Sequence, residues 1–315
     1  MKYVRFMVVD GSDLSLINNL AHNLTTTQSE FQFLVHDKPL VFPRSAAAAR
    51  DGLDKLEGIA LKLAKKEYPD EFPVVVCNSK FKGYKFARNS VDVSIIITSG
   101  LPPNTTPGFL DKYIAYVLVD ALMGLRVSIL GHRPSRKCAG DIWEKVEEVA
   151  EGLAQGDYCT ACLKKIRNAV GRDITVHELA ALFRILDYTA NRKVCFVMMP
   201  FSKAFTAIYK NCLRPTLKGQ QWECRRADEI FQSTAVMDLV REEILRADLI
   251  VADLTGKNPN VFYELGYAHA VDKTTILITQ SIEDVPFDLR HRQLIEYQRT
   301  PRGLKRLAEN IVKYV

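Results

Sequence analysis

The amino-acid sequence predicts an α/β protein. We expect a doubly wound parallel sheet of the flavodoxin or Rossmann kind in the C-terminal half and an α+β domain in the N-terminal half. From Lys193 onward, short apolar runs alternate with amphipathic segments, a pattern typical of strands that are covered by helices. Residues 249–252 are apolar without interruption, as expected of a strand that is buried on both faces.

The elements of the C-terminal half follow from these patterns. Residues 205–217 and 301–315 predict helices, and a further stripe of apolar residues at helical spacing runs through 236–247. Strands are expected at residues 194–199, 222–226, 249–253 and 274–279.

The N-terminal half mixes both kinds of pattern. Helices are predicted at residues 46–66, 109–125 and 176–186, and strands at residues 3–9, 74–77 and 93–98. The chain therefore divides into an α+β domain at residues 1–168, a helical connector at 169–192 and an α/β domain at 193–315.

Composition excludes several classes of protein. With 315 residues, 47% of them hydrophobic and 25% charged, the chain is typical of a soluble globular protein. No apolar run reaches the roughly 18 residues that span a bilayer, and the first ten residues turn polar too soon for a signal peptide. Seven cysteines favour a reduced compartment. We therefore expect a cytoplasmic protein without membrane contact.

The net charge of +6 is spread along the chain and does not cluster in a run. This distribution favours phosphate-bearing small ligands and gives no case for nucleic acid as a partner.

Polar residues follow three of the predicted strands, at 199–202, 225–229 and 253–260. The carboxyl ends of parallel strands lie at one edge of a sheet, where the ligand crevice forms. We expect these residues to contact a ligand: Phe201, Ser202, Arg225, Arg226, Asp253, Asn258, Asn260 and Tyr263.

Glu264 is the strongest candidate for chemistry. Asn260 is the predicted N-cap of the helix after the strand at 249–253, which places Glu264 in the first turns beside Tyr263. The helix dipole favours the ionised carboxylate there, so Glu264 suits a nucleophile or an anionic stabiliser. The alternatives are a solvent-exposed Glu264 and a Tyr263 that packs in the core.

Four C-terminal motifs resemble those of the nucleoside 2-deoxyribosyltransferase-like superfamily, which is related in architecture to TIR-type NAD hydrolases. They are Val-Met-Met-Pro-Phe201, Arg-Ala-Asp-Glu229, Ala-Asp-Leu-Thr-Gly256 and Asn-Pro-Asn-Val-Phe-Tyr-Glu-Leu-Gly266. The resemblance implies that Glu264 attacks the anomeric carbon and that Asp238 binds the sugar or activates the base. This chain has Asn258 where the family often has a second acid, which puts transferase activity in doubt.

Cleavage of an N-glycosidic bond passes through an oxocarbenium-like state that one carboxylate can stabilise or capture. Nicotinamide leaves without strong acid help because it is cationic in NAD, so the missing acid favours NAD-like substrates. Arg225 or Arg226 would hold phosphates with help from Ser202 and backbone amides. Alternation along the strand would leave only one of the two arginines facing the ligand.

In the N-terminal half, the segment Val117-Leu-Val-Asp-Ala-Leu-Met-Gly-Leu-Arg-Val127 resembles a zincin helix of the archaemetzincin kind that has lost its metal ligands. Such a helix has two histidines four residues apart, a glutamate after the first, and a third histidine beyond a glycine. With Gly124 as that glycine, the ligand positions hold Val117, Ala121 and Val127 and the base position holds Leu118. The resemblance implies a catalytically inactive domain that acts as a sensor or an assembly platform.

Cys138, Cys159 and Cys162 resemble part of the structural zinc site of that same family, which uses four cysteines. His132 is the predicted fourth ligand. Three unconnected thiols are the alternative.

We therefore expect an N-glycosidase that cleaves the base–sugar bond of NAD or of a deoxynucleoside 5′-monophosphate through Glu264, with no cofactor required for catalysis. Its domain pairing resembles that of anti-phage effectors, with homo-oligomerisation and an activating ligand at the N-terminal domain. The alternative is a non-catalytic, nucleotide-binding signalling module in which Glu264 contacts ribose hydroxyls. An active metallopeptidase conflicts with the missing His-Glu-x-x-His motif.

Overall fold

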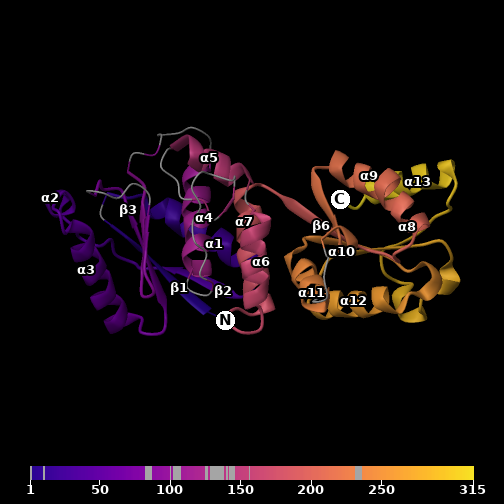
Figure 1. The fold of residues 1–315 in the computed structure, drawn as a ribbon, viewed down its shortest axis with the longest axis horizontal. Helices are drawn as coiled ribbons and strands as arrows, with labels where there is room; N and C mark the ends of the chain where they lie inside the picture. Colours follow the sequence, from indigo (N-terminus) through magenta and orange to yellow (C-terminus); the bar gives the residue numbers. More distant parts are fainter. Residues whose placement is uncertain are drawn as a thin grey trace. The chain divides into compact units, whose positions relative to one another are not determined.

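The computed structural model describes residues 2–9, 11–81, 87–99, 101, 108–124, 127, 138–139, 141, 146–155, 157–230 and 236–315. They form two compact units, Met1–Ala190 and Asn191–Val315, each with a largely or wholly parallel sheet (Figure 1). The predicted α/β class is confirmed. Among the described helices, none combines the length and apolar character that a membrane span needs.

The sheet of the first unit has the order β2-β1-β3-β5-β4. Four of its described strands are parallel, and β4 runs antiparallel to β5 at the edge. Their bounds are β1 Lys2–Val8, β2 Phe31–Val35, β3 Phe72–Cys77, β4 Ala87–Asn89 and β5 Ser94–Ile97.

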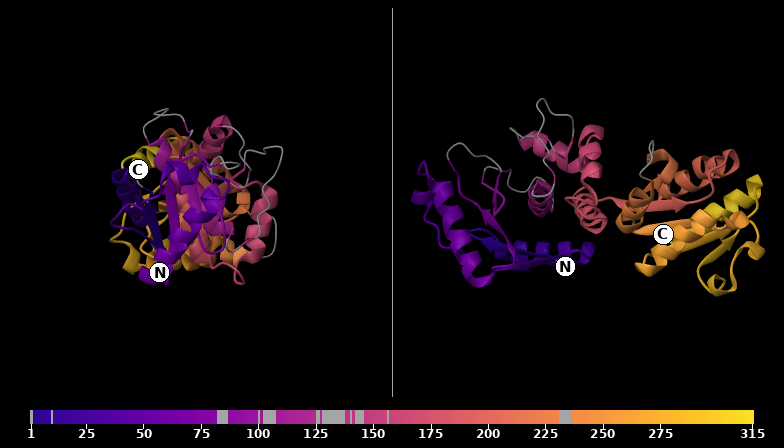
Figure 2. Two further views of the ribbon diagram at one scale, coloured as in Figure 1. Left: turned by 90° about the vertical axis from the view of Figure 1, so that its left-hand side faces the viewer. Right: turned by 60° about the horizontal axis from the view of Figure 1, so that its bottom comes forward.

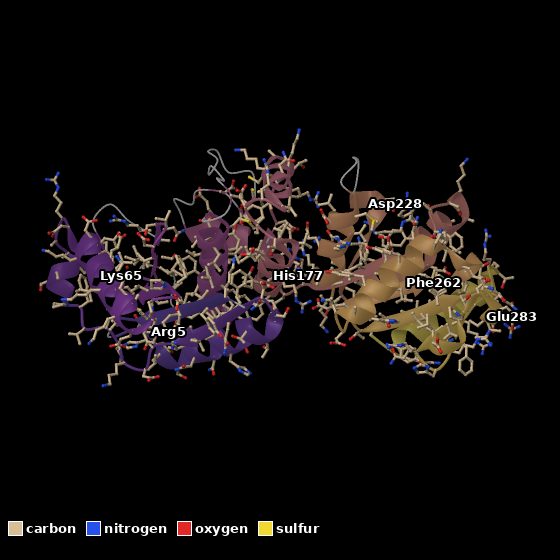
Figure 3. All side chains as sticks on the ribbon, turned by 90° about the horizontal axis from the view of Figure 1, so that it is seen from below. Arg5, Lys65, His177, Asp228, Phe262 and Glu283 are labelled. Atoms are coloured by element: carbon tan, nitrogen blue, oxygen red, sulfur yellow. The ribbon has the colours of Figure 1, made fainter. Side chains whose placement is uncertain are left out.

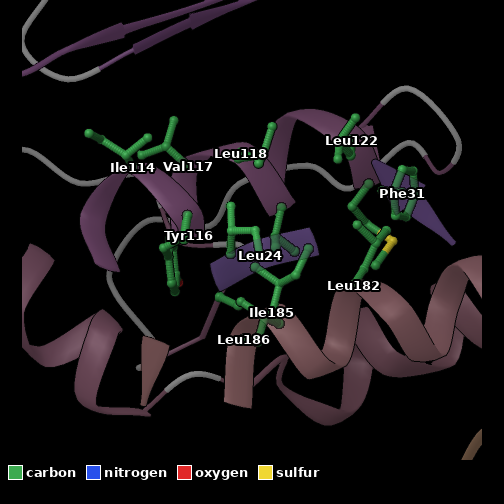
Figure 4. Packing of buried hydrophobic residues seen from close by; sticks show 14 of the residues in the cluster. Leu24, Phe31, Ile114, Tyr116, Val117, Leu118, Leu122, Leu182, Ile185 and Leu186 are labelled. Carbon is green, nitrogen blue, oxygen red and sulfur yellow. The ribbon is translucent and has the colours of Figure 1, made fainter. Parts of the chain in front are cut away.

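Helices cover both faces of this sheet (Figures 1 and 2). Alternate residues of β1 point to opposite faces: Val4 and Phe6 pack with α1, α4 and α7, whereas Met7 packs with α3. The first of these cores is drawn in Figure 4. The helices are α1 Leu14–Thr27, α2 Arg44–Ala47, α3 Gly52–Glu67, α4 Phe109–Gly124, α5 Val146–Gln155, α6 Thr160–Ala169 and α7 Val176–Thr189.

The single helix predicted at residues 46–66 is two helices, α2 and α3, joined by a turn. The chain bends back on itself at Gly52. A Cβ atom there would lie 2.4 Å from the carbonyl oxygen of Ala46 and 2.6 Å from that of Ala47. Only glycine allows this close approach. The alanine- and lysine-rich composition favours a helix throughout residues 46–66, so composition alone did not reveal the break.

α7 belongs to the first unit. Thr175 and Glu178 form a capping box at its N-terminus, and its apolar side chains, among them Leu179 and Phe183, lie in the core shared with α1 and α4. Residues 169–192 were expected to connect the two halves, and most of them instead form part of one half.

The sheet of the second unit is parallel throughout its described strands, in the order β10-β9-β8-β6-β7. The strands are β6 Lys193–Met198, β7 Trp222–Arg226, β8 Leu249–Asp253, β9 Thr275–Thr279 and β10 Leu294–Glu296. The first four match the predicted strands closely. β6, β8 and β9 are largely apolar runs that mark strands buried on both faces, whereas β7 is a more polar strand at the edge of the sheet.

Two layers of helices enclose this sheet (Figure 1). Residues of α9, α13 and the π-helical turn η1 pack on one face, and residues of α11 and α12 pack on the other. The helical elements are α8 Lys203–Ile208, η1 Tyr209–Leu213, α9 Arg214–Gly219, α10 Ala227–Ile230, α11 Val236–Arg246, η2 Thr255–Lys257, α12 Pro259–Ala270, η3 Ile282–Asp284, η4 Phe287–Leu289 and α13 Pro301–Val312.

Candidate functional site

The candidate site lies where the order of strands reverses in the second unit. The chain passes from β6 to β7 on one side and then returns to place β8 on the other side of β6. Met198 and Ala252 are neighbours in this pairing, so the loops that follow β6 and β8 leave the sheet together. In doubly wound sheets a crevice forms at this point, outside the carboxyl ends of the strands.

The loop after β8 is held by hydrogen bonds to Asp253, one from within the loop and one from Tyr297 after β10. Asp253, which is fully buried, accepts from the Thr255 amide at 3.1 Å and from the Tyr297 hydroxyl at 2.6 Å. Burial raises the pKa of the Asp253 carboxyl, and the Thr255 and Tyr297 hydrogen bonds oppose that rise. Asp253 therefore shapes the loop and does not reach a ligand directly.

Asn258 is the N-cap of α12. Its side-chain oxygen accepts from the amides of Asn260 at 3.0 Å and Val261 at 3.3 Å. The predicted cap, Asn260, is instead an exposed residue of the first turn. The proline at 259 explains the shift, because proline favours the first helical position and so places the cap just before it.

Glu264 lies in the second turn of α12 and is half-buried. Burial raises the pKa of its carboxyl to about 7. Among the described residues, none donates a hydrogen bond to it or pairs with its charge. Burial thus opposes the ionised form that the helix dipole was expected to favour.

Arg241 contacts both Asp238 and Tyr263. The Arg241 guanidinium donates to the Tyr263 hydroxyl at 3.0 Å and lies 3.4 Å from the Asp238 carboxylate. It also lies 5.8 Å from the centroid of the Tyr267 ring. Asp238 and Tyr263 are exposed, so this group joins the surfaces of α11 and α12. Arg241 was missed in the sequence, although its spacing of three from Asp238 places both on one helical face.

The two candidate phosphate-binding arginines are already paired with acids. Arg225 lies 2.7 Å from the Glu223 carboxylate and 3.5 Å from that of Glu243 on α11. These contacts leave only 14% of its side chain exposed. Its charge is therefore neutralised inside the unit.

Arg226 is held more tightly still, with 1% of its side chain exposed. It pairs with Asp228, which is labelled in Figure 3, donates to Thr206 at 3.0 Å and stacks on the Tyr209 ring at 4.7 Å. A phosphate could reach this guanidinium only after these contacts break. Both arginines stabilise the fold, in contrast to the expectation from their position after a strand.

Phe201 and Ser202 flank the start of the helix that follows β6. Phe201 is 62% exposed, and the Ser202 side chain caps α8 by accepting from the Phe205 amide at 3.5 Å. Exposed aromatic surface beside a helix N-terminus suits contact with a planar, phosphate-bearing ligand.

Three cysteines in the first unit lie together. The sulfur atoms of Cys138, Cys159 and Cys162 are all within 4.8 Å of one another, and the Cys159 amide donates to the Cys138 sulfur at 3.1 Å. Tetrahedral zinc with bonds of about 2.3 Å would separate its sulfur ligands by about 3.8 Å, so the cluster fits that geometry. The fourth predicted ligand, His132, lies outside the described residues.

The residues at the positions that the zincin resemblance assigns to the metal ligands and the base are buried. Val117, Leu118, Ala121 and Val127 are all at most 7% exposed, and Val117, Leu118 and Val127 belong to the apolar core. Apolar side chains in a close-packed core provide no donor for a metal ion.

No family model and no curated protein matches this sequence. Among solved structures, a zinc-dependent peptidase from Methanocorpusculum labreanum is 14% identical, over 52% of this chain and 99% of that chain, with a TM-score of 0.35. Archaemetzincin from Methanopyrus kandleri is 16% identical, over 54% of this chain and 96% of that chain, also with a TM-score of 0.35. Similarity this weak supports no conclusion about activity.

These structures are zinc-dependent peptidases and not N-glycosidases or NAD-related enzymes. The comparisons thus return zinc-dependent peptidases where NAD-cleaving and TIR-like N-glycosidases were expected, and that expected classification is not kept. In the second unit, Asp238 is exposed and paired with Arg241, Asn258 is the N-cap of α12, and burial raises the pKa of Glu264.

Proposed function

We propose that the second unit is a non-catalytic nucleotide-binding module in which Glu264 contacts the hydroxyls of a ribose. The observation that carries the proposal is the half-buried Glu264 carboxyl, which has no partner among the described residues and a pKa of about 7. Near neutral pH such a group both donates and accepts hydrogen bonds, as sugar hydroxyls do. A nucleophile for glycosidic cleavage would instead need a pKa low enough to keep it ionised.

The phosphate of the nucleotide would lie at the start of α8. This helix follows β6, so its N-terminus is at the same edge of the sheet as the loop after β8. α8, η1 and α9 run on without a break from Lys203 to Gly219, and backbone amides at a helix N-terminus bind phosphate. This position replaces Arg225 and Arg226, which are committed to acidic partners.

Calorimetric titration of the full chain with adenosine 5′-monophosphate and its 2′-deoxy counterpart tests the proposal. We expect the ribonucleotide to bind about 2–10 times more tightly, because one hydrogen bond is worth about 0.5–1.5 kcal/mol. Glu264→Ala should remove this preference. Glu309→Gln, which neutralises an exposed glutamate on α13, is the matched control and should keep it.

Free base is measured by chromatography in the same samples. Base release by the wild-type protein that Glu264→Gln abolishes would show that the unit is an enzyme and that the proposal is wrong. Equal binding of both nucleotides to the wild type and to Glu264→Ala would show that Glu264 does not contact the ribose.

We also infer that Cys138, Cys159 and Cys162 hold a structural zinc ion, with His132 as the candidate fourth ligand. The close approach of the three sulfur atoms supports this. Elemental analysis of the purified chain should give about one zinc per chain, and Cys159→Ser should lower both the zinc content and the thermal stability. Cys212→Ser changes a buried cysteine of the other unit and should retain zinc. Equal zinc content in both variants would contradict the inference.

A further inference from the structure

A pocket in the first unit is independent of the site described above. Its volume is about 320 Å³, and it lies beneath the first residues of β1, β2 and β3, between the sheet and the helices α4 and α7. Figure 4 shows three of its apolar lining residues, Phe31, Leu122 and Leu182, at one end of the core. This volume is at the lower limit of cavities that bind small molecules.

The pocket is open to solvent at one end. Tyr3 is 42% exposed and Val91 is 78% exposed, and both line it. The remaining lining is apolar apart from Lys2 and Glu178, which form an ion pair. A small molecule that enters would therefore meet a predominantly apolar surface and one pair of opposite charges.

The two members of this ion pair differ in mobility. Glu178 has 5% of its side chain exposed, and one of its oxygens accepts from both the amide and the hydroxyl of Thr175, each at 3.0 Å. The other oxygen accepts from Lys2, whose side chain is 42% exposed. Glu178 is thus fixed by the capping box of α7, whereas the long Lys2 side chain can move out into water at little cost.

We propose that this pocket binds a small apolar amine, whose ammonium group replaces that of Lys2 on the Glu178 carboxylate. The exchange keeps one positive charge beside one buried negative charge, so no unpaired charge is left in an apolar site. The aryl or alkyl part of the amine fills the space between Phe31, Leu122 and Leu182. A carboxylate ligand would instead bring a second negative charge next to Glu178, which cannot move away.

Three probes of similar shape test the proposal with the full chain: 2-phenylethylamine, 3-phenylpropanoate and neutral 2-phenylethanol. Binding is followed by calorimetry and by chemical-shift changes of isoleucine, leucine and valine methyl groups. The amine should bind at least fivefold more tightly than the alcohol, and the carboxylate should bind most weakly. The methyl shifts should be largest at Leu122, Ile174 and Leu182, which line the pocket.

Variants of the ion pair separate the amine proposal from its alternatives. Lys2→Gln removes the competing ammonium and should raise amine affinity at least threefold. Glu178→Gln should remove the preference for the amine over the alcohol, and it keeps the capping box because glutamine also serves there. Leu182→Trp should block all three probes, whereas Lys164→Gln, at an exposed position of α6, should leave binding unchanged.

Two outcomes would overturn the proposal. Tighter binding of the carboxylate, weakened by Lys2→Gln, would make this an anion site. Equal binding of the three probes, or no binding to either the wild type or Lys2→Gln, would show that the charge pair does not select a ligand.

Discussion

At the scale of single residues, the charged side chains at the candidate site are of two kinds: those whose charge is paired within the unit, and Glu264, which has no partner among the described residues. Arg226 and Asp253 are almost or wholly buried and hydrogen-bonded within the unit. Glu264 is the exception, because burial acts on its carboxyl and no described partner compensates for it. A group of this kind weakens the fold in its ionised form, which is typical of functional positions.

The raised pKa of Glu264 predicts how stability depends on pH. The folded value of about 7 lies above the ordinary value of 4.5. Between these two pH values the folded state therefore retains a proton that the unfolded state has lost. This contribution to the free energy of unfolding is present below pH 4.5, falls as pH rises, and is lost above pH 7. Glu264→Gln has no charge to bury, so its stability relative to wild type should increase by about 3 kcal/mol over this range, at 1.36 kcal/mol for each unit between pH 4.5 and about 7.

Urea denaturation at pH 4.5 and pH 8 measures the effect. Trp222 fluorescence in a Trp143→Phe background reports on the second unit, because Trp222 lies in β7. Glu309→Gln on the exposed side of α13 is the control and should show no comparable pH dependence. A Glu264→Gln difference that is equal at both pH values would mean that Glu264 titrates normally.

At the scale of secondary-structure elements, backbone constraints decide where helices begin and end. Asn258 and Pro259 set the start of α12 and so determine that Glu264 lies in the second turn. Gly52 sets the break between α2 and α3, because the carbonyl of Ala46 occupies the space that any side chain would need. Asn258, Pro259 and Gly52 thus fix where their helices begin. The hydrophobic pattern alone does not predict these positions.

Two glycines of α3 should respond oppositely to the same substitution. Gly52→Ala forces a Cβ atom against two backbone carbonyls and should lower the free energy of unfolding by about 1–3 kcal/mol. Gly58→Ala adds a methyl group with no atom within 4 Å and should raise it by about 0.5–1 kcal/mol, because alanine favours the helix. Chemical denaturation followed by circular dichroism checks both, and a neutral Gly52→Ala would show that α2 can move aside.

At the scale of the whole molecule, each unit has its own hydrophobic cores. The two clusters of the first unit contain no residue of the second, and the reverse also holds among the described residues. The separation predicts independent folding. Homo-oligomerisation and an activating ligand of the N-terminal half stay predictions.

Two fragments that differ only in their starting point test this organisation. Residues 191–315 should unfold cooperatively on their own, because both of their cores are complete. Residues 169–315 carry α7 without its partners and expose Leu179, Leu182, Phe183 and Leu186, which are buried in the intact chain. This longer fragment should be less soluble and should aggregate in analytical ultracentrifugation. Equal behaviour of both fragments would show that α7 does not depend on the first unit.

The sequence by itself determined the α/β class, four strands of the second unit and the edge of the sheet at which its polar loops gather. Apolar runs in β6, β8 and β9, the alternation of strands with amphipathic segments, and the rule for parallel sheets are enough for these. The cysteine cluster was expected from the family resemblance and not from spacing: Cys159 and Cys162 are close in sequence, whereas the fold brings Cys138 to them. Strand β2 and the turn before Gly52 were not predicted, because short strands and close backbone approaches leave weak local patterns.

Only the tertiary structure decided which charges are free to act. Arg225, Arg226 and Asp253 have the residue types and positions of a ligand site, and each has, besides a partner two residues away, a partner from a distant part of the chain: Glu243, Thr206 and Tyr297, respectively. The same holds for Glu264, because burial in the folded chain raises the pKa of its carboxyl. The solvation and pairing of a charge depend on everything packed around it, so they appear only when the chain is folded.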